Sequence, residues 1–249
     1  TASGVSNLLG KYICLADWKI EHIITGEYIC EEIIELEEKI LKTVRSCLKD
    51  IAEGDEPACE KLMYGLIFSG LAAQMAGSSR PSFSAEHHLL HLWEMEVIND
   101  RLEALHGEKI SVATMLVLQK YKHIAAVIRE GRCRVRSCPQ DESILIKKTF
   151  GNKDIFGKIN KENQPDPLEE INPARLEECL TEIADVIDEL PQEEELLQAM
   201  KKAGCKYSVY DIGLTDEIIS LSLKLAPYVS RRLSLLRIGK MLEIEGESV

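Results

Sequence analysis

The sequence predicts an all-α fold, a helical bundle, and two observations carry that prediction. Nearly every long segment repeats its apolar residues at intervals of three or four, which is the period of an amphipathic α-helix. No regular alternation of strands and helices occurs, and no repeat of fixed length is evident. With 249 residues the chain can bury a sizeable core, and length alone leaves the number of domains open.

The first part of the chain shows four helical patterns in succession. They are expected over residues 7–24, 27–51, 57–75 and about 82–97. The first three are followed by Gly26, Gly54 and Gly77, which are typical helix stop signals. The segment 57–75 is apolar on nearly all sides, so we expect it at the centre of the bundle. The segment before it is expected to be exposed along its Glu-rich side.

A second strongly apolar helix is expected over residues 110–128, where interspersed Lys, Gln and His residues favour a core helix over a membrane span. The periodicity then fades over residues 132–173, which predicts loops and short helices. Further helices are expected over residues 173–190, 191–203, 215–225 and 228–243. Residues 207–210 are expected to form an extended connector.

The composition restricts the classes of partner. Thirty basic and 42 acidic residues give a net charge of −12, and the basic residues are scattered, which argues against nucleic-acid binding. A local Arg or Lys can still bind the phosphate of a small substrate. No run of eighteen apolar residues and no signal peptide occurs, so we expect no membrane insertion and a cytoplasmic location. None of the eight cysteines forms a Cys-x-x-Cys pair, which favours free thiols.

Residues 77–107 are the most informative stretch, because they hold four of the six histidines. His87 and His91 are four residues apart, so on a helix they project from one face, and His106 follows after the helical pattern breaks. Imidazole suits zinc and similar divalent ions, and a catalytic zinc site usually has three protein ligands. A hydrogen-bonded pair without a metal is the alternative that spacing leaves open.

Three strings carry a resemblance to a known family. They are SRPSFSAEHHLLHLWEM at 79–95, LHGEK at 105–109 and GVSNLLGKYICLADWK at 4–19. Together they resemble the helical C-terminal domain of the sn-glycerol-1-phosphate dehydrogenases, which group with glycerol dehydrogenases, iron-type alcohol dehydrogenases and dehydroquinate synthase. The resemblance is strong over residues 4–129 and returns over 229–242. In that last stretch an Arg-rich helix matches in character, with Arg231, Arg232 and Arg237.

The resemblance implies roles for individual residues. His87 and His106 would be metal ligands, and the third ligand, an aspartate in the family, falls on Asn7. An amide oxygen can coordinate a divalent cation but brings no negative charge, so metal affinity should fall. His91 would lie near nicotinamide and substrate and relay a proton, with a structural hydrogen-bonding role as its alternative. The substrate phosphate would meet one of two basic residues, Arg80 or Lys11.

The implied activity is NAD(P)-linked interconversion of dihydroxyacetone phosphate and sn-glycerol 1-phosphate, a step of phospholipid metabolism. The metal would be zinc, with iron or nickel as alternatives, and it would polarise the ketone oxygen. No strand, Gly-rich turn and helix unit appears, so we interpret residues 1–249 as the metal- and substrate-binding domain without the N-terminal nucleotide-binding domain. The chain begins with Thr1, which fits that interpretation.

Several consequences and alternatives follow from the missing nucleotide-binding unit. NAD(P) would be bound through the absent domain, and the isolated chain should be inactive. The partner is a small phosphorylated triose or polyol, and a homo-oligomer is compatible with the sequence. Two alternatives stay open, namely a non-catalytic helical binding or assembly module and another polyol or alcohol dehydrogenase of the superfamily.

Overall fold

A computed structural model describes residues 1–151 and 155–246, and helices dominate it, as the sequence predicts. The α-helices are α1 (Ala2–Leu9), α2 (Lys11–Thr25), α3 (Glu31–Arg45), α4 (Leu48–Glu53), α5 (Glu56–Met75), α6 (Ala85–Glu94), α7 (His106–Arg129), α8 (Ser143–Phe150), α9 (Phe156–Glu162), α10 (Pro173–Asp188), α11 (Glu193–Lys202), α12 (Glu217–Leu225) and α13 (Leu235–Ile238). Short 3-10 helices are η1 (Arg80–Ser82), η2 (Pro167–Glu170), η3 (Val209–Ile212), η4 (Ala226–Tyr228) and η5 (Gly239–Met241). Two short strands, β1 (Cys133–Val135) and β2 (Leu242–Ile244), pair antiparallel.

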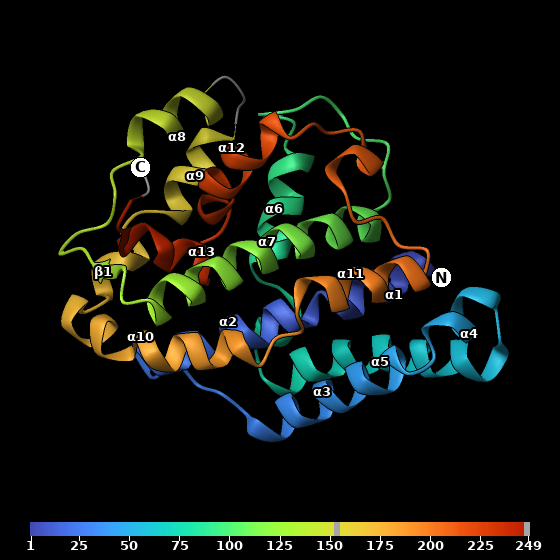
Figure 1. The fold of residues 1–249 in the computed structure, drawn as a ribbon. Helices are drawn as coiled ribbons and strands as arrows, with labels where there is room; N and C mark the ends of the chain where they lie inside the picture. The colour runs from blue at the N-terminus through green and yellow to red at the C-terminus, as the bar shows by residue number, and fades with distance from the viewer. Residues whose placement is uncertain (152–154, 247–249) are drawn as a thin grey trace.

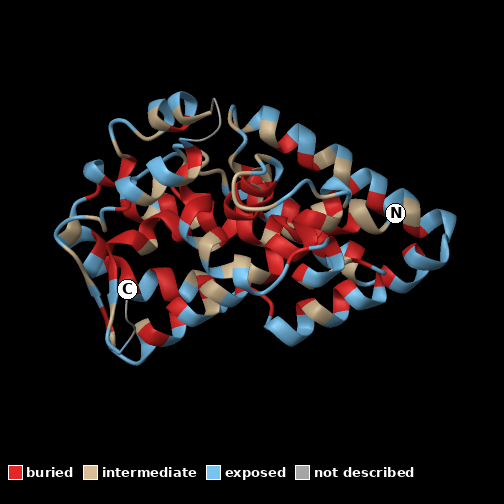
Figure 2. Ribbon diagram, turned by 90° about the horizontal axis from the view of Figure 1, so that it is seen from above, coloured by how far each residue is buried: buried red, intermediate tan, exposed pale blue. Residues whose placement is uncertain are grey.

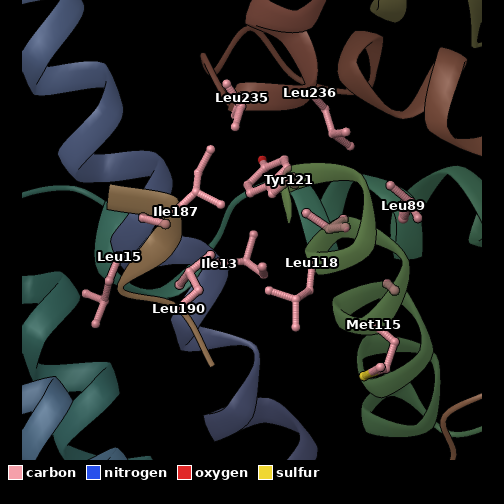
Figure 3. Close-up of a cluster of buried hydrophobic side chains, with 14 of the residues drawn as sticks. Ile13, Leu15, Leu89, Met115, Leu118, Tyr121, Ile187, Leu190, Leu235 and Leu236 are labelled. Carbon is pink, nitrogen blue, oxygen red and sulfur yellow. The ribbon is translucent and has the colours of Figure 1, made fainter. Parts of the chain in front are cut away.

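Helix α7 crosses the middle of the molecule and organises the packing (Figure 1). It contacts α1, α6, α10 and α11 along its length. The buried residues gather along this central axis, and the exposed ones lie on the outer faces of the surrounding helices (Figure 2). In the core, side chains from five helices meet: Ile13, Leu89, Leu118, Ile187 and Leu235 (Figure 3). The prediction that residues 110–128 form a buried helix is therefore confirmed.

Two of the predicted helices are each divided in two. Residues 7–24 belong to α1 and α2, which meet at Gly10. A Cβ atom at Gly10 would lie 3.3 Å from Cγ2 of Ile110 on α7, so the missing side chain lets this junction approach the central helix. Residues 27–51 contain α3 and α4, separated by a turn at Ser46 and Cys47. The exposed Glu-rich side of α3 is as predicted.

The expectation that the segment 57–75 lies at the centre of the bundle is wrong. Helix α5 packs at the edge of the molecule against α1, α3 and α4 (Figure 1). Leu62 is buried, but most of the large apolar side chains of α5 are exposed: Met63, Tyr64, Ile67, Leu71 and Met75. Its inward side is mostly small, and a Cβ atom at Gly65 would lie 2.7 Å from Cγ2 of Ile40 and 2.9 Å from Cδ1 of Leu8. Small residues therefore bring α5 close to its neighbours, and most of the large ones are turned outward.

The predicted helix over residues 228–243 is also wrong. The chain there forms η4, an irregular stretch, α13, η5 and β2. The hydroxyl of Ser234 accepts a hydrogen bond from the backbone N–H of Arg237 and so starts α13. The Arg237 side chain is fully buried and donates to the carbonyl of Pro227 and to Oδ1 of Asn163. The local bond at Ser234 and the tertiary bonds of Arg237 together replace the continuous helix.

Two further expectations concern membranes and cysteines. Within residues 1–151 and 155–246, no helix combines the length and the apolar character needed to cross a membrane. All eight cysteines lie in described parts of the chain and are free thiols, as predicted.

Candidate functional site

The start of α6 is fixed by the buried carboxylate of Asp17 on α2. This carboxylate accepts hydrogen bonds from the hydroxyl of Ser84 and, at 3.4 Å, from the N–H of Ala85, at the first turn of α6. It also accepts from the hydroxyl of Tyr121 at 2.7 Å and from the N–H of Leu235 at 2.8 Å. Burial raises the pKa of Asp17 to about 6, while these hydrogen bonds act in the opposite direction. Asp17 thus ties α6 to α2, α7 and α13.

Three histidines gather where α6 meets the first turn of α7. His87 and His91 lie one turn apart on α6, with ring centres 6.3 Å apart. His106 is the first residue of α7, and its ring centre lies 5.9 Å from that of His87. The Phe83 ring packs against His87 at 4.8 Å and His91 at 5.5 Å. The structure therefore brings together the three histidines that the sequence singles out.

Two of these imidazoles are hydrogen-bonded to carboxylates that the sequence analysis did not identify. Nδ1 of His87 lies 2.6 Å from Oε1 of Glu86, and Nδ1 of His91 lies 3.0 Å from Oε2 of Glu94. A carboxylate on one ring nitrogen fixes the tautomer and leaves the other nitrogen available. For the second pair the sequence does hold a signal, because Glu94 follows His91 by three residues on one helix.

Glu94 also connects α6 to α7. Its Oε1 accepts from the ammonium group of Lys109 at 2.6 Å and lies 4.0 Å from Nδ1 of His106. Although burial raises the pKa of Glu94, the hydrogen bonds from Lys109 and His91 outweigh it and hold that pKa below its usual value. Burial, and then the neighbouring His87, lower the pKa of His106. The imidazole of His106 is therefore biased toward its neutral form, which is the form that binds metals.

His88, between the two site histidines on α6, has a different environment. Its side chain is fully buried and neither ring nitrogen has a hydrogen-bond partner. Burial lowers the pKa of His88 to about 3, so the ring is neutral. It packs edge-on against Phe83 with ring centres 5.5 Å apart. His88 is therefore part of the packing beneath the cluster.

Asn7 lies on α1, close to the start of α7. Its amide nitrogen donates to the carbonyl of Ser3 at 3.0 Å, within its own helix, and it is not hydrogen-bonded to a histidine. Ser3 is pressed against Gly107, where a Cβ atom would lie 2.7 Å from Cα of Ser3. Because Gly107 follows His106 directly, α1 is held next to this histidine, and Asn7 is one turn along.

The two basic residues proposed for phosphate are both engaged. The guanidinium group of Arg80 forms an ion pair with Glu21, whose side chain is buried. Lys11 is itself buried and donates from Nζ to the carbonyl of Ser82 at 3.1 Å. Either side chain would have to exchange a protein partner for a substrate phosphate, and their assignment stays a prediction.

Arg232 is a cation directly beside the histidines. Its guanidinium carbon lies 5.3 Å from the centre of the Phe83 ring, the ring that touches His87 and His91. It donates to the carbonyl of Phe83 and to the hydroxyl of Ser79, which are both neutral acceptors. Arg232 is one of three arginines in residues 229–242 that the resemblance singles out, but nothing in the sequence indicates its position next to α6.

The histidine cluster fits a divalent metal. Two imidazoles that share one zinc ion at about 2 Å have ring centres roughly 5–6 Å apart, and the His87 and His106 rings match that spacing at 5.9 Å. The carboxylate on Nδ1 of His87 is the usual arrangement behind a ligand that binds through Nε2.

No family model matches the chain. It is similar to proteins named glycerol-1-phosphate dehydrogenase [NAD(P)+] from several organisms. The one from Geobacillus stearothermophilus is 27% identical over 225 residues, which cover 90% of this chain and 48% of the relative. The one from Halalkalibacterium halodurans is 26% identical over 236 residues, 94% of this chain and 51% of the relative. The Pyrococcus furiosus protein is 34% identical over 116 residues, 47% of this chain and 33% of the relative. The chain spans about half the length of the first two relatives.

Proposed function

We propose, since the chain is homologous to the C-terminal half of glycerol-1-phosphate dehydrogenases, that residues 1–249 form the metal- and substrate-binding domain of such an enzyme. The reaction would be the NAD(P)-linked interconversion of dihydroxyacetone phosphate and sn-glycerol 1-phosphate. The observation that carries the proposal is the convergence of His87, His91 and His106 from two helices. NAD(P) would be bound by a nucleotide-binding domain that is not part of residues 1–249.

In this proposal His87 and His106 hold the metal through the nitrogens that face away from their carboxylates, with the amide oxygen of Asn7 as third donor. Zinc is our first choice, and iron and nickel are the alternatives. When bound, the metal supplies Lewis-acid polarisation of the substrate ketone. Asn7 contributes no charge, so the site relies on two neutral imidazoles and an amide.

His91 would move the proton. Its Nδ1–H donates to Glu94, so the doubly protonated ring would give its Nε2 proton to the alkoxide oxygen that hydride transfer creates and return to the neutral tautomer that Glu94 holds. Glu94 holds the ring in place and is itself anchored by Lys109. Proton transfer by a positioned histidine typically contributes 10²–10⁴ in rate, so His91→Ala should lower kcat by about that factor in the complete enzyme.

Arg232 is well placed for the substrate phosphate. Its guanidinium group is next to the Phe83 ring and its described partners are neutral oxygens, so its positive charge is not neutralised by a hydrogen-bonded carboxylate. A guanidinium group can grip phosphate through two parallel hydrogen bonds. Arg80 and Lys11 remain proposed for the same role.

We also propose a cytoplasmic location, with which eight free thiols agree.

The test combines activity with metal binding. NADH and NADPH oxidation driven by dihydroxyacetone phosphate should be absent for the chain alone and present for a longer natural product that contains it. His91→Ala should abolish most of that activity, and His22→Ala, on an exposed part of α2, is the matched control.

Calorimetric zinc titration of Asn7→Asp should show at least tenfold tighter binding, about 1.4 kcal/mol, because a carboxylate adds a charge. Combining it with His87→Ala or His106→Ala should cancel that gain.

A non-catalytic helical binding or assembly module is the second candidate. It is favoured by Asn7 in place of an acidic ligand and by the exposed apolar side of α5. Two results together would favour the module. Every natural form of the protein would fail to reduce dihydroxyacetone phosphate, and Asn7→Asp would bind zinc no tighter than the parent chain.

A further inference from the structure

A second group of potential ligands includes His87 but neither His91 nor His106. Cys14 of α2 donates from its thiol to Oε1 of Glu86 at 2.9 Å, and the same oxygen lies 2.6 Å from Nδ1 of His87. One ligand atom from each of the three residues lies within 4.8 Å of the other two. Cys14 and Glu86 are 72 residues apart in the chain, so no short sequence motif predicts this group.

The carboxylate of Glu86 is incompletely satisfied. Its side chain is fully buried, and Oε2 has no hydrogen-bond partner. An unpaired buried carboxylate oxygen is costly, because it loses its hydration without compensation. Cys14 is also buried, while the His87 side chain is 12% exposed. The group can therefore be reached from the outside past the His87 ring.

The nearest cations do not complete the group. Lys11 donates to the carbonyl of Ser82, and Arg232 donates to Phe83 and Ser79. Neither side chain is hydrogen-bonded to Glu86, although both are close enough to act on the group electrostatically. A small cation between the thiol, the carboxylate and the imidazole would meet a sulfur, an oxygen and a nitrogen donor at once.

We propose that Cys14, Glu86 and His87 form a binding site for a divalent metal that binds thiolates, such as zinc. Three protein ligands of the S, O and N classes leave a fourth tetrahedral position open, and a thiolate selects zinc or cobalt over magnesium or calcium. As the metal–sulfur bond forms, the Cys14 thiol proton is released to solvent. The neutral His87 ring binds through Nδ1 and keeps its proton on Nε2.

This site does not depend on the dehydrogenase reaction and shares only His87 with the ligand set proposed above. A neutral imidazole offers one lone pair, so His87 serves one of the two sites at a time. The thiolate and the carboxylate bring two negative charges, whereas Asn7 and His106 bring none. The metal should therefore occupy the Cys14 site first, at one equivalent per chain. The zinc titration of Asn7→Asp is accordingly made in a Cys14→Ser background, where only the ligand set of His87, His106 and Asn7 remains.

Cobalt(II) titration of the reduced, chelator-treated chain tests this. A thiolate-to-cobalt charge-transfer band in the near ultraviolet should saturate at one equivalent. Cys14→Ser should remove the band and weaken binding at least tenfold, and Glu86→Gln should weaken binding by a similar factor. Two matched controls should keep both the band and the affinity. They are Cys47→Ser, a buried cysteine outside the group, and His22→Ala, an exposed histidine of α2.

Each other outcome overturns the inference. Cobalt binding without a charge-transfer band, lost in His106→Ala, would place the metal between His87 and His106, supporting the proposed function and excluding the Cys14 site. A band that survives in Cys14→Ser would assign the thiolate to another cysteine. No cobalt binding at all would leave the group as a hydrogen-bonded triad, while the dehydrogenase proposal would still be judged by the activity of a longer product. Should Cys14→Ser lose its helical circular dichroism, the Glu86→Gln result decides.

Discussion

Helices α5 and α7 are both strongly apolar in sequence, yet the fold uses them in opposite ways. Leu118 and Val117 of α7 are fully buried, whereas Ile67 and Leu71 of α5 are 60% and 48% exposed. Helix α7 is covered by α1, α6, α10 and α11, and α5 is covered only on the side of its small residues. Apolar composition thus says how much of a helix can be buried. Which side is buried depends on where the small residues allow close approach.

The largest expected contrast between the two helices is in the cost of truncating a leucine. Leu118→Ala should lower the free energy of unfolding by about 2–5 kcal/mol, because it opens a cavity at a fully buried position. Leu71→Ala should cost well under half of that, since its side chain is half exposed. Urea unfolding followed by circular dichroism measures both. Equal losses would mean that the outer side of α5 is packed in this chain.

A second contrast is that α5 covers a buried charge. Glu37 of α3 is fully buried and neither carboxyl oxygen makes a hydrogen bond. Burial raises the pKa of Glu37 to about 7, although the positive charge of Lys11 partly opposes the shift. Between about pH 4.5 and 7 the folded state therefore binds more protons than the unfolded state, and stability falls as pH rises, by on the order of 3 kcal/mol in total.

Glu37→Gln should flatten this pH dependence. Urea unfolding of wild type and Glu37→Gln at several pH values across that window is the measurement. Glu38→Gln, one residue along on the more exposed side of α3, is the matched control and should keep the wild-type slope. A slope shared by all three proteins would assign the pH dependence to other groups.

A third test concerns the polar contact of α7. Tyr121 is buried and its hydroxyl donates to Asp17 at 2.7 Å. Tyr121→Phe should cost about 1.5–3 kcal/mol, the range for a hydrogen bond to a charged group. Tyr64→Phe on α5, where the side chain is 66% exposed, should have no measurable effect. The same urea titration compares the two, and a neutral Tyr121→Phe would show that Asp17 is satisfied without α7.

The smallest expected effect is on the outer side of α5 itself. Ile67→Glu should leave the free energy of unfolding within about 0.5 kcal/mol, because surface substitutions rarely do more. It should reduce binding of an apolar fluorescent dye, since it interrupts a row of exposed Met, Tyr, Ile and Leu side chains. Thr181→Glu, at an exposed position of α10, is a control that leaves the row intact. Unchanged dye binding would mean that the dye reports another surface.

Periodicity was sufficient to predict the helical fold and the buried α7, because both follow from residues close together in the chain. It could not predict that Gly65 and Ser69 would face inward on α5, since that depends on Leu8 and Ile40 in other helices. Periodicity also did not predict that the helical pattern is interrupted at Ser234, because a serine cap competes with an otherwise helical pattern.

In the candidate site, too, some residues could be predicted from the sequence and others could not. The pairing of His87 with His91 follows from spacing, and His106 entered through the resemblance to a known family. The contact of Glu94 with His91 could have been predicted from their spacing on one helix. The contacts of Cys14 and Arg232 with α6 could not, because each residue comes from a distant part of the chain. Their positions depend on tertiary packing.

The bond from Leu235 to Asp17 has a consequence for how the protein is made. It joins residues 218 positions apart, so the hydrogen bonds that fix the start of α6 stay incomplete until Leu235 has been synthesised and has left the ribosome. Contacts of such long sequence separation slow folding, because a large loop must close before they can form. The histidines of α6 are synthesised well before Leu235 and are fixed in place only after it. The nascent chain thus has an extended period in which a chaperone, or a metal ion, can reach that segment before the fold closes around it.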